Sequence, residues 1–421
     1  MYYKRCIEKK IEKALKSSGA VQVVGPKFCG KTTTCMLYQK SNVRLNTEAS
    51  IKAAEINPAA VLIGDNPRLI DEWQMVPDIW NQVKSDLDLD YQFGKYLLTG
   101  STTPADKSKI YHSGAGRIAT IKMRPMSLYE SGESSGKYSL EMLFKNSKNF
   151  EPDTKNDVTL EDIAFYMARG GWPLSILSDK DVSLDITQNY FSGLFAFENN
   201  KNEKFRNKKP EIFRMVLKSY ARNISTECPA QTIIEDIKQS NEKAMTAKTY
   251  DEYVEALKDV YIIEDVLAWN PNIRSKTSIR STPTRHFVDT SIALRALNIS
   301  PDDLMNDFNS FGLFFEDFVV RDLSIYAESL GGEIRHYRDN AGLECDAVLH
   351  LNNGQWAAIE IKLGGEELIE SGAKSLNLLE KKIAEKSNEK LPSFKMIITA
   401  CGPSYVREDG IYVVAINRLR P

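Results

Sequence analysis

The sequence predicts an α/β protein in which a parallel sheet is followed by a helical middle part and a second α/β domain. Three observations indicate this order. Near the N-terminus, the β-prone run Val21–Val24 leads into a glycine-containing loop and a helix start. Residues 187–300 carry apolar side chains mostly at helical spacing. Residues 334–362 read as strands around an Asn-Asn-Gly turn, which is typical of a β-hairpin.

Length and composition limit the class of protein. A chain of 421 residues is too long for one hydrophobic core, so we expect about two to four domains. A hydrophobic share of 42% and a charged share of 27% are those of a soluble globular protein. No apolar run is long enough to span a bilayer, and the start does not resemble a signal peptide. We therefore expect a cytoplasmic protein.

Cysteine, histidine and charge exclude further classes. The six cysteines include no C-x-x-C pair and there are only four histidines, so we expect no zinc site. Reduced thiols agree with a cytosolic setting. The net charge is −2, so any nucleic-acid surface must come from local basic clusters rather than from the whole chain.

The first chemical motif is Gly25-x4-Gly30-Lys31-Thr32, which stands between a predicted strand and a predicted helix. The glycines let backbone N–H groups turn around a phosphate, and the helix N-terminus adds partial positive charge. Lys31 would reach the β- and γ-phosphates, and the Thr32 hydroxyl would ligate Mg2+. The motif predicts ATP and Mg2+ as cofactors, held by a loop that consists of Gly25, Pro26, Lys27, Phe28, Cys29, Gly30, Lys31, Thr32 and Thr33.

A second apolar strand ends in Asp71 and Glu72, about 40 residues after the loop. Asp71 would hold Mg2+, directly or through water, and Glu72 would polarise the water that attacks the γ-phosphate. A third buried strand, Tyr96–Leu98, leads into Thr99 and Ser101. Either hydroxyl is a candidate sensor of the γ-phosphate, and the alternative is that both only stabilise the turn.

Arg117 follows a glycine-rich segment and stands just before the next predicted strand. An arginine at this point is a candidate finger that reaches the nucleotide of a neighbouring subunit, with Arg124 as the second choice. The alternative is a surface arginine that pairs with an acidic neighbour. Because a finger in trans requires a neighbour at each site, we expect a ring of subunits, a hexamer.

Together these motifs resemble the prokaryotic AAA-type ATPases that carry an uncharacterised C-terminal domain. The residues that carry the resemblance are Gly25-x4-Gly30-Lys31-Thr32, Ile70-Asp71-Glu72-x-Gln74, Leu98-Thr99-Gly100-Ser101, Gly116-Arg117 and Arg124-Pro125-x-Ser127-Leu128-x-Glu130. The resemblance covers nearly the whole chain. It implies a five-stranded ATPase sheet of the additional-strand type, sites between subunits, and a nuclease-like C-terminal domain.

The middle of the chain begins with residues 131–158, which are rich in Ser, Gly, Lys and Asn and read as a loop or hinge. A helix from Thr159 then stops at a Gly-Gly-x-Pro element, for which packing is the expected role. Three helical runs and a two-stranded ribbon follow, and this order predicts a winged helix. The helical runs are Phe213–Asn223, Ala230–Ile237 and Ala247–Leu257.

Two basic clusters beside the predicted winged helix are candidates for contact with nucleic-acid phosphates. The first precedes its first helix and consists of Lys201, Lys204, Arg206, Lys208 and Lys209. The second would line the wing and consists of Arg274, Lys276, Arg280 and Arg285. The alternative is that these charges form solvated faces, and many winged helices join proteins rather than DNA.

A second chemical constellation lies in the C-terminal part, from about Pro301. Asp346 stands on one arm of the predicted hairpin, and Glu360 and Lys362 stand on the other, two residues apart and therefore on one face. An Asp followed across a hairpin by Glu-x-Lys is the arrangement of the PD-(D/E)xK nuclease fold. The helix at 367–386 and strands at 394–399 and 411–416 favour the same fold.

The residue types match this chemistry. Asp346 and Glu360 would supply hard oxygen ligands for Mg2+, and Glu316 from the preceding helix would complete the metal site. Lys362 would orient the attacking water or offset charge on the phosphate. The alternative is a half-exposed hairpin with cross-strand acid–lysine pairs.

The sequence therefore predicts an α/β protein made of a P-loop AAA-type parallel sheet, a helical winged-helix middle domain and a C-terminal α/β restriction-endonuclease-like domain. The expected units are an ATPase domain at 1–130, a linker and helical segment at 131–204, a winged-helix-like domain at 205–300 and a nuclease-like domain at 301–421. The expected function is ATP hydrolysis coupled to metal-dependent cleavage of DNA, with four-way junctions as one candidate substrate. The alternative is an ATP-dependent switch or scaffold whose C-terminal domain binds nucleic acid or protein without cutting.

Overall fold

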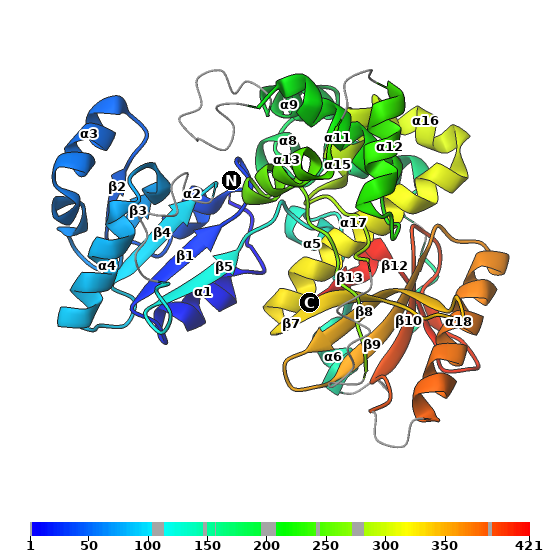
Figure 1. Ribbon diagram of the computed structural model, residues 1–421. Coiled ribbons are helices and arrows are strands. Elements are labelled where there is room, and N and C mark those ends of the chain that lie inside the picture. Colours follow the sequence, from blue (N-terminus) through cyan, green and yellow to red (C-terminus); the bar gives the residue numbers. More distant parts are fainter. Residues whose placement is uncertain are drawn as a thin grey trace.

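The computed structural model describes residues 2–102, 113–145, 150–155, 157–194, 208–240, 245–271, 282–385 and 390–421. Two large sheets organise most of these residues, and Figure 1 shows them on opposite sides of the molecule. The helices of the middle part lie beside the C-terminal sheet. Within the described ranges, no helix has the length and apolar character needed to cross a membrane.

The N-terminal sheet has five parallel strands in the order β2-β3-β4-β1-β5. Strand β4 stands between β1 and β3, which confirms the additional-strand arrangement. Because all strands run in one direction, the loops that follow β1, β3 and β4 meet at the C-terminal ends of the strands. The strands are β1 (Ala20–Val24), β2 (Ser41–Arg44), β3 (Arg68–Asp71), β4 (Tyr96–Gly100) and β5 (Ile118–Lys122).

Two apolar layers cover this sheet. On one face, Ile11 and Ala14 of the first helix pack against Val21 and Val23, as their helical spacing predicts. On the other face, Trp73 and Trp80 pack against the sheet, with their ring centroids 5.0 Å apart. The elements around the sheet are α1 (Glu8–Leu15), α2 (Lys31–Cys35), α3 (Glu48–Ile56), α4 (Asp78–Leu89), η1 (Pro58–Leu62) and η2 (Trp73–Met75).

The predicted helical middle forms, but it starts earlier than residue 205. Helices α7 and α9 pack against α15, so helices on both sides of that expected boundary share contacts. The helices of this part are α7 (Leu160–Arg169), α8 (Pro173–Ile176), α9 (Lys180–Gly193), α11 (Pro210–Arg222), α12 (Ala230–Ser240), α13 (Ala247–Asp259), α15 (Thr290–Leu297) and α16 (Pro301–Asn306). The three predicted helical runs correspond to α11, α12 and α13.

A short ribbon follows α13. Antiparallel bridges join Ile263 to Phe287 and Val266 to Thr284, and a parallel bridge joins Ala268 to His336. The ribbon therefore reaches the edge of the C-terminal sheet. Three helices followed by this ribbon have the order that a winged helix would have, and that assignment stays a prediction.

The C-terminal sheet has six strands in the order β11-β12-β10-β9-β8-β7. Strands β7, β8 and β9 are antiparallel, so the predicted hairpin forms, and β10 and β12 then run parallel to β9. Helix α17 covers one face and α18 the other. The elements are α17 (Phe308–Ser329), β7 (Gly332–Arg338), β8 (Glu344–Leu351), β9 (Trp356–Lys362), α18 (Glu366–Ala384), β10 (Phe394–Thr399), β11 (Tyr405–Val406), β12 (Tyr412–Ala415), η5 (Ile416–Arg418) and β13 (Leu419–Arg420).

One hydrophobic core joins the helical middle to the α17 side of this sheet. It runs from Leu128 through Phe213 and Phe315 to Ile398 and Leu419. The expected boundary at residue 300 is therefore not a gap in packing, and the two parts bury their apolar faces together.

The prediction of a loop or hinge at residues 131–158 is wrong for residues 138–145, which form regular structure, while the other described residues from 132 to 158 are irregular. Strand β6 (Tyr138–Ser139) pairs with β13, and short helices α5 (Leu128–Ser131) and α6 (Leu140–Lys145) flank it. The Ser134 hydroxyl donates to the Leu419 carbonyl oxygen (2.6 Å), and Arg418 lies 3.1 Å from the Asp153 carboxylate. The polar composition that suggests a hinge instead supplies hydrogen bonds to the returning C-terminal strand.

Candidate functional sites

The glycine-containing loop after β1 has the backbone that its motif predicts. Gly25 has φ +152°, and a Cβ atom there would lie 2.0 Å from the Met123 carbonyl oxygen, so only glycine fits. Gly30 has φ +101° and begins α2. The Lys31 ammonium donates to the carbonyl oxygens of Gly25 (2.9 Å) and Pro26 (2.7 Å), so the loop itself holds this cation. Of the remaining predicted members, Lys27, Phe28 and Cys29 lie in the loop before Gly30, and Thr33 lies in α2.

Three polar side chains from neighbouring elements meet at Asp71, the last residue of β3. The Thr32 hydroxyl donates to Asp71 Oδ1 (2.7 Å), and the Thr99 hydroxyl of β4 donates to the same oxygen. Arg44, on the other neighbouring strand, places its Nε 3.4 Å from Asp71 Oδ2. A hydroxyl and a carboxylate in contact are hard oxygen donors that fit Mg2+.

Glu72 lies beside this group with φ +61°, a left-handed conformation that is uncommon for a residue with a side chain. Its Oε2 accepts hydrogen bonds from the Ser101 hydroxyl (3.1 Å) and from the Gln74 amide. Of the two candidate sensors, Thr99 therefore contacts Asp71 and Ser101 contacts Glu72. The sensor role of either residue stays a prediction.

Sequence reasoning missed Arg5, a buried residue beneath the loop. Its Nη1 donates to the Cys29 carbonyl oxygen (2.8 Å), its Nη2 donates to the Arg124 carbonyl oxygen (2.7 Å), and its Nε lies 3.1 Å from Glu130. Arg5 thus fixes the loop to the chain after β5. The signal that could have found it is a charged residue directly before a predicted amphipathic helix.

The Gly-Gly-x-Pro element packs beside the loop, as expected. Gly171 accepts a hydrogen bond from the Met126 backbone (2.6 Å), and a Cβ atom on Gly171 would lie 2.1 Å from the Met126 carbonyl oxygen. Phe28, which is 72% exposed at the loop, makes an edge contact with Tyr190 of α9. The helical middle therefore touches the loop directly.

Arg117 lies at the start of β5, whereas the loop follows the end of β1. Because β1 and β5 are adjacent and parallel, Arg117 lies at the N-terminal ends of the strands and the loop lies at their C-terminal ends. Arg117 Nε lies 2.8 Å from Asp88 Oδ1 at the surface, which is the alternative pairing considered for it. Arg117 does not reach the nucleotide site of its own chain, so its role as a finger for a neighbouring subunit stays a prediction.

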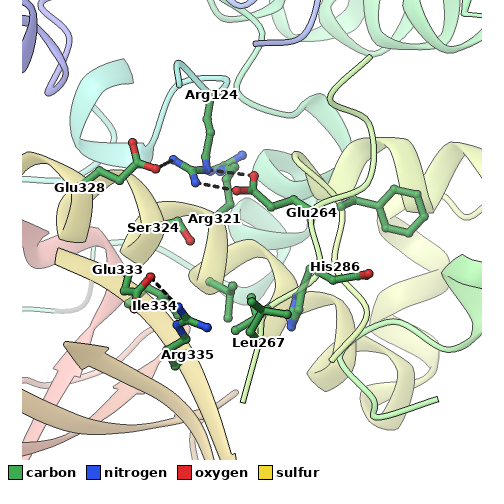
Figure 2. A pocket seen from close by; sticks show the side chains of 14 residues that line it. Arg124, Glu264, Leu267, His286, Arg321, Ser324, Glu328, Glu333, Ile334 and Arg335 are labelled. Carbon is green, nitrogen blue, oxygen red and sulfur yellow. Dashed lines mark hydrogen bonds and ion pairs between the residues drawn. The ribbon is translucent and has the colours of Figure 1, made fainter. Parts of the chain in front are cut away.

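Arg124, the second choice for a finger, is buried in an ion-pair cluster. Its guanidinium donates to both Glu264 oxygens (2.9 and 2.6 Å) and lies 2.9 Å from Glu328, as Figure 2 shows. Burial alone would raise the pKa of Glu264, but Arg124 and Lys122 lower it. Arg124 therefore joins β5, the ribbon and α17 at a cavity of about 210 Å³, and these contacts remove it as a finger candidate.

The second predicted constellation converges in space. Lys362 Nζ lies 2.9 Å from Asp346 Oδ2 and 2.7 Å from Glu360 Oε2, and the Ile361 backbone N–H donates to Asp346 (2.7 Å). Glu316 of α17 interacts electrostatically with all three side chains. We call Glu316, Asp346, Glu360 and Lys362 the carboxylate–lysine cluster.

Burial and mutual repulsion shape the charge of this cluster. Burial, followed by the Asp346 charge, raises the pKa of Glu360 to about 8, and the same two causes raise the pKa of Glu316. Burial opposes a charged Lys362, but Asp346 and Glu360 together raise its pKa. With every group ionised, three carboxylates and one ammonium leave two uncompensated negative charges.

The cluster is not a preformed metal site. Among the described residues, no three His, Cys, Asp or Glu side chains are arranged to hold a metal ion. In the cluster, the Lys362 ammonium lies between Asp346 and Glu360. The oxygen donors and the surplus negative charge suit a divalent cation in type, and the lysine would have to move aside for direct ligation.

The predicted nucleic-acid contacts are tested only in part. Arg274, Lys276 and Arg280 lie outside the described residues, as do Lys201, Lys204 and Arg206. Lys208 pairs with Glu252 (3.3 Å). The placement of Arg285 on the wing surface is wrong: its Nε donates to the Cys228 carbonyl oxygen (2.9 Å) and its Nη1 lies 3.1 Å from Asp265, so it is buried and structural.

Comparison with family models divides the chain into three regions. Residues 17–132 match a model described as AAA domain. Residues 160–303 match a domain of unknown function, DUF8612, and residues 311–419 match another, DUF4143. The first match and the five-stranded parallel sheet define the N-terminal part as a P-loop AAA-type ATPase domain, for which ATP is the implied ligand.

Two relatives and one solved structure are similar over longer stretches. The uncharacterized proteins Mb2031c of Mycobacterium bovis and Rv2008c of Mycobacterium tuberculosis are each 21% identical over 359 residues, which cover 84% of this chain and 72% of theirs. The Walker-type ATPase PABY2304 of Pyrococcus abyssi is 14% identical, with a TM-score of 0.41 over 69% of this chain and 94% of that chain.

Proposed function

We propose that this protein couples ATP hydrolysis to metal-dependent cleavage of phosphodiester bonds in DNA. The observation that carries the second half of this proposal is the convergence of Glu316, Asp346, Glu360 and Lys362 from one helix and two strands. Residues that stand up to 46 positions apart in sequence, from 316 to 362, thus form one polar cluster between helix α17 and strands β8 and β9.

At the N-terminal site, the residues divide the work of ATP hydrolysis. Lys31 would turn from its loop carbonyls to the β- and γ-phosphates. Mg2+ would be held by Thr32 and Asp71, whose oxygens lie 2.7 Å apart, and would offset phosphate charge. Glu72 would take a proton from the water that attacks the γ-phosphate.

At the C-terminal cluster, burial of like charges supports a role beyond packing. A central strand that buries Glu360 beside Asp346 and near Glu316 places acids where ionisation is costly. Such arrangements concentrate at functional sites because stability alone does not favour them. A half-exposed hairpin with ordinary cross-strand pairs would not bury Glu360, which is only 3% exposed.

The chain's own residues then have distinct tasks in cleavage. Glu316, Asp346 and Glu360 would hold a divalent cation, which would supply charge neutralisation at the scissile phosphate. Lys362 would orient the attacking water or donate to the phosphate oxygen. The backbone N–H of Ile361 fixes Asp346 in place (2.7 Å).

A single helix supports coupling between the two sites. Helix α17 carries Glu316 in the cluster and Glu328, which pairs with Arg124 directly after β5. Residue Met123, next to Arg124, lies against Gly25 of the nucleotide loop. A conformational change of the loop on ATP binding or hydrolysis would thus be transmitted to the cluster through a contiguous set of packed groups.

DNA and further copies of this chain are the proposed partners. Arg274, Lys276 and Arg280 are proposed to contact the phosphate backbone. Arg117 is proposed to reach the nucleotide of the next subunit in a ring, a hexamer, because it lies at the sheet edge opposite its own loop. Four-way junctions are the proposed branched substrate.

The test is a cleavage gel with purified protein and linear, single-stranded and four-way DNA, with and without ATP and Mg2+. We expect nicking that requires Mg2+ and is lost in Lys362→Ala, with ATPase activity retained. Lys395→Ala is the matched control, because Lys395 stands on the adjacent strand β10 and pairs with Glu380 outside the cluster. Equal cleavage by the Lys362 and Lys395 variants would contradict the assignment.

A second function is favoured by one observation, the position of Lys362 between Asp346 and Glu360. An ammonium that satisfies both carboxylates could hold the sheet in a form that binds nucleic acid or protein without cutting. The protein would then be an ATP-dependent switch or scaffold. Absence of cleavage of any DNA or RNA form by the parent protein, with Mg2+ or Mn2+, would support this function over the first.

A further inference from the structure

Gln74 is a buried polar residue directly beside the proposed catalytic carboxylate. It lies in η2, two residues after Glu72, and is 7% exposed. Its amide nitrogen donates to Glu72 Oε2, the oxygen that also accepts from Ser101 (3.1 Å). Within the described residues, both of these donors to the Glu72 carboxylate use this one oxygen, which leaves Oε1 open to accept a proton.

The other end of the Gln74 amide has no hydrogen-bond partner among the residues that the structure describes. Gln74 Oε1 is buried without a hydrogen-bond donor in the described part of the chain. Buried acceptors are normally satisfied, so an exception needs an explanation. A Cβ atom on Gly100 would lie 2.8 Å from this oxygen, so the oxygen lies against the end of β4. Gly100 pairs with Val24, the residue directly before the nucleotide loop.

The surrounding backbone holds this amide in place. Glu72 has φ +61°, an uncommon conformation that turns the chain sharply between Asp71 and Gln74. Trp73 and Val76, on either side of Gln74, are each 1% exposed and anchor the turn in the core. The amide is therefore a rigid group at the C-terminal ends of the strands, where the nucleotide loop lies, rather than a mobile surface side chain.

We propose that Gln74 is a positioning residue for ATP hydrolysis: its N–H fixes the Glu72 carboxylate that receives a proton from the attacking water. This inference rests on the proposed ATPase activity. In the step itself, the water oxygen bonds to the γ-phosphorus, the bond from that phosphorus to the ADP oxygen breaks, and Glu72 receives one water proton. Gln74 exchanges no atom and acts only through orientation.

The test compares Gln74→Met, an apolar side chain of similar length, with the parent protein in ATP turnover and in binding of a fluorescent ATP analogue. We expect kcat to fall about 10- to 100-fold, as for a misplaced catalytic group, while KM and the Kd of the analogue change less than about twofold. Gln22→Met is the matched control, since Gln22 is a buried glutamine of the same sheet that bonds to Thr120. It should retain turnover.

Three results would overturn the inference. Unchanged kcat in Gln74→Met would show that the amide orients nothing. An equal loss of turnover and ATP affinity, or the same loss in Gln22→Met, would assign Gln74 a packing role. If the parent protein hydrolyses no ATP, the proposed ATPase activity fails together with this inference. Should Gln74→Met fail to fold, Gln74→Asn, which withdraws the amide by one methylene, gives the same comparison.

Discussion

At the residue scale, the nucleotide site depends on hydrogen bonds between side chains of adjacent strands. Asp71 receives hydroxyl groups from Thr32 and Thr99, while Glu72 receives Ser101. Each carboxylate is thus held by its own set of donors. This separation supports different tasks for the two acids, metal binding for Asp71 and proton transfer for Glu72.

Glu72→Gln should retain ATP binding and lose hydrolysis. The amide keeps the size and the contacts to Ser101 and Gln74 but cannot take a proton, so phosphate release should fall at least about 100-fold. Lys31→Ala should instead abolish binding of a fluorescent ATP analogue. Glu48→Gln, a surface substitution on α3, is the control. Hydrolysis by Glu72→Gln at the parental rate would remove Glu72 as the base.

Arg117→Ala should lower ATP turnover without weakening nucleotide binding, because the finger acts on the neighbour's γ-phosphate. Asp88→Ala removes the partner of Arg117 but leaves the cation. We therefore expect turnover in Asp88→Ala to stay at or above the parental rate. A similar loss in both variants would mean that the ion pair only supports the local structure.

At the element scale, the ribbon and strand β7 form a joint that buries a histidine. His336 exchanges backbone hydrogen bonds with Leu267 (3.1 Å) and Trp269 (2.6 Å) and is 3% exposed. Burial, followed by the charge of His286, lowers the pKa of His336 to about 4. Glu227 places its Oε1 3.4 Å from His336 Nδ1, and burial raises the pKa of Glu227 itself.

The free energy of unfolding should fall on acidification from pH 6.5 towards pH 4. In that window the unfolded chain binds a proton at position 336 and the folded chain does not, so lower pH favours unfolding. The loss attributable to His336 is about 3 kcal/mol at most. His336→Asn should flatten the pH dependence of urea unfolding, whereas His350→Asn on strand β8 should not. An unchanged profile in both would reject the assignment.

The predicted wing is a second element whose role can be measured. Neutralising Arg274, Lys276 and Arg280 together should weaken DNA binding and flatten its dependence on salt, by about one unit of log slope for each phosphate that the protein no longer neutralises. Neutralising Lys9, Lys13 and Lys16 on or beside α1 is the matched control. A salt slope that is unaltered in the wing variant would indicate a protein partner for this element.

At the scale of the whole molecule, helix α17 connects the three regions. Its Asp322 accepts the backbone N–H of Leu128 (2.9 Å), its Arg321 pairs with Asp289 (2.9 Å), and its Glu328 pairs with Arg124. Its Glu316 belongs to the carboxylate–lysine cluster. The helix is therefore bonded at several points to the segments that leave the ATPase sheet and the helical middle.

Arg124→Met should destabilise the protein strongly. It would break the pairs with Glu264 and Glu328, leaving Lys122 at 2.7 Å from Glu264 and Lys10 at 3.9 Å from Glu328, and the loss of the buried guanidinium should cost about 3 kcal/mol. Lys145→Met, which removes a surface pair with Glu141, should cost less than about 1 kcal/mol. Urea unfolding of the two variants measures the difference. Equal effects would mean that the Arg124 cluster does not join the regions.

Local patterns in the sequence determine the elements of both sites. Spacing and turn chemistry predict these elements because each depends on residues close in sequence. They are the strand, glycine loop and helix at 21–34, the strand end at Asp71 and Glu72, and the hairpin around residue 353. The two faces of a strand also follow from alternation, which is why Glu360 and Lys362 could be paired in advance. The match of residues 17–132 to an AAA domain agrees with the first of these predictions.

Tertiary structure alone decided how these elements combine. Three features depend on residues distant in sequence. They are the burial of Arg124 and Arg285, the docking of residues 131–145 on β13, and the buried Gln74 Oε1, which has no hydrogen-bond donor among the described residues. Spacing along the chain does not encode such contacts, because any of several packings would satisfy the same local pattern. The physical reason is that a charged or polar side chain becomes structural or catalytic according to the partners that burial gives it.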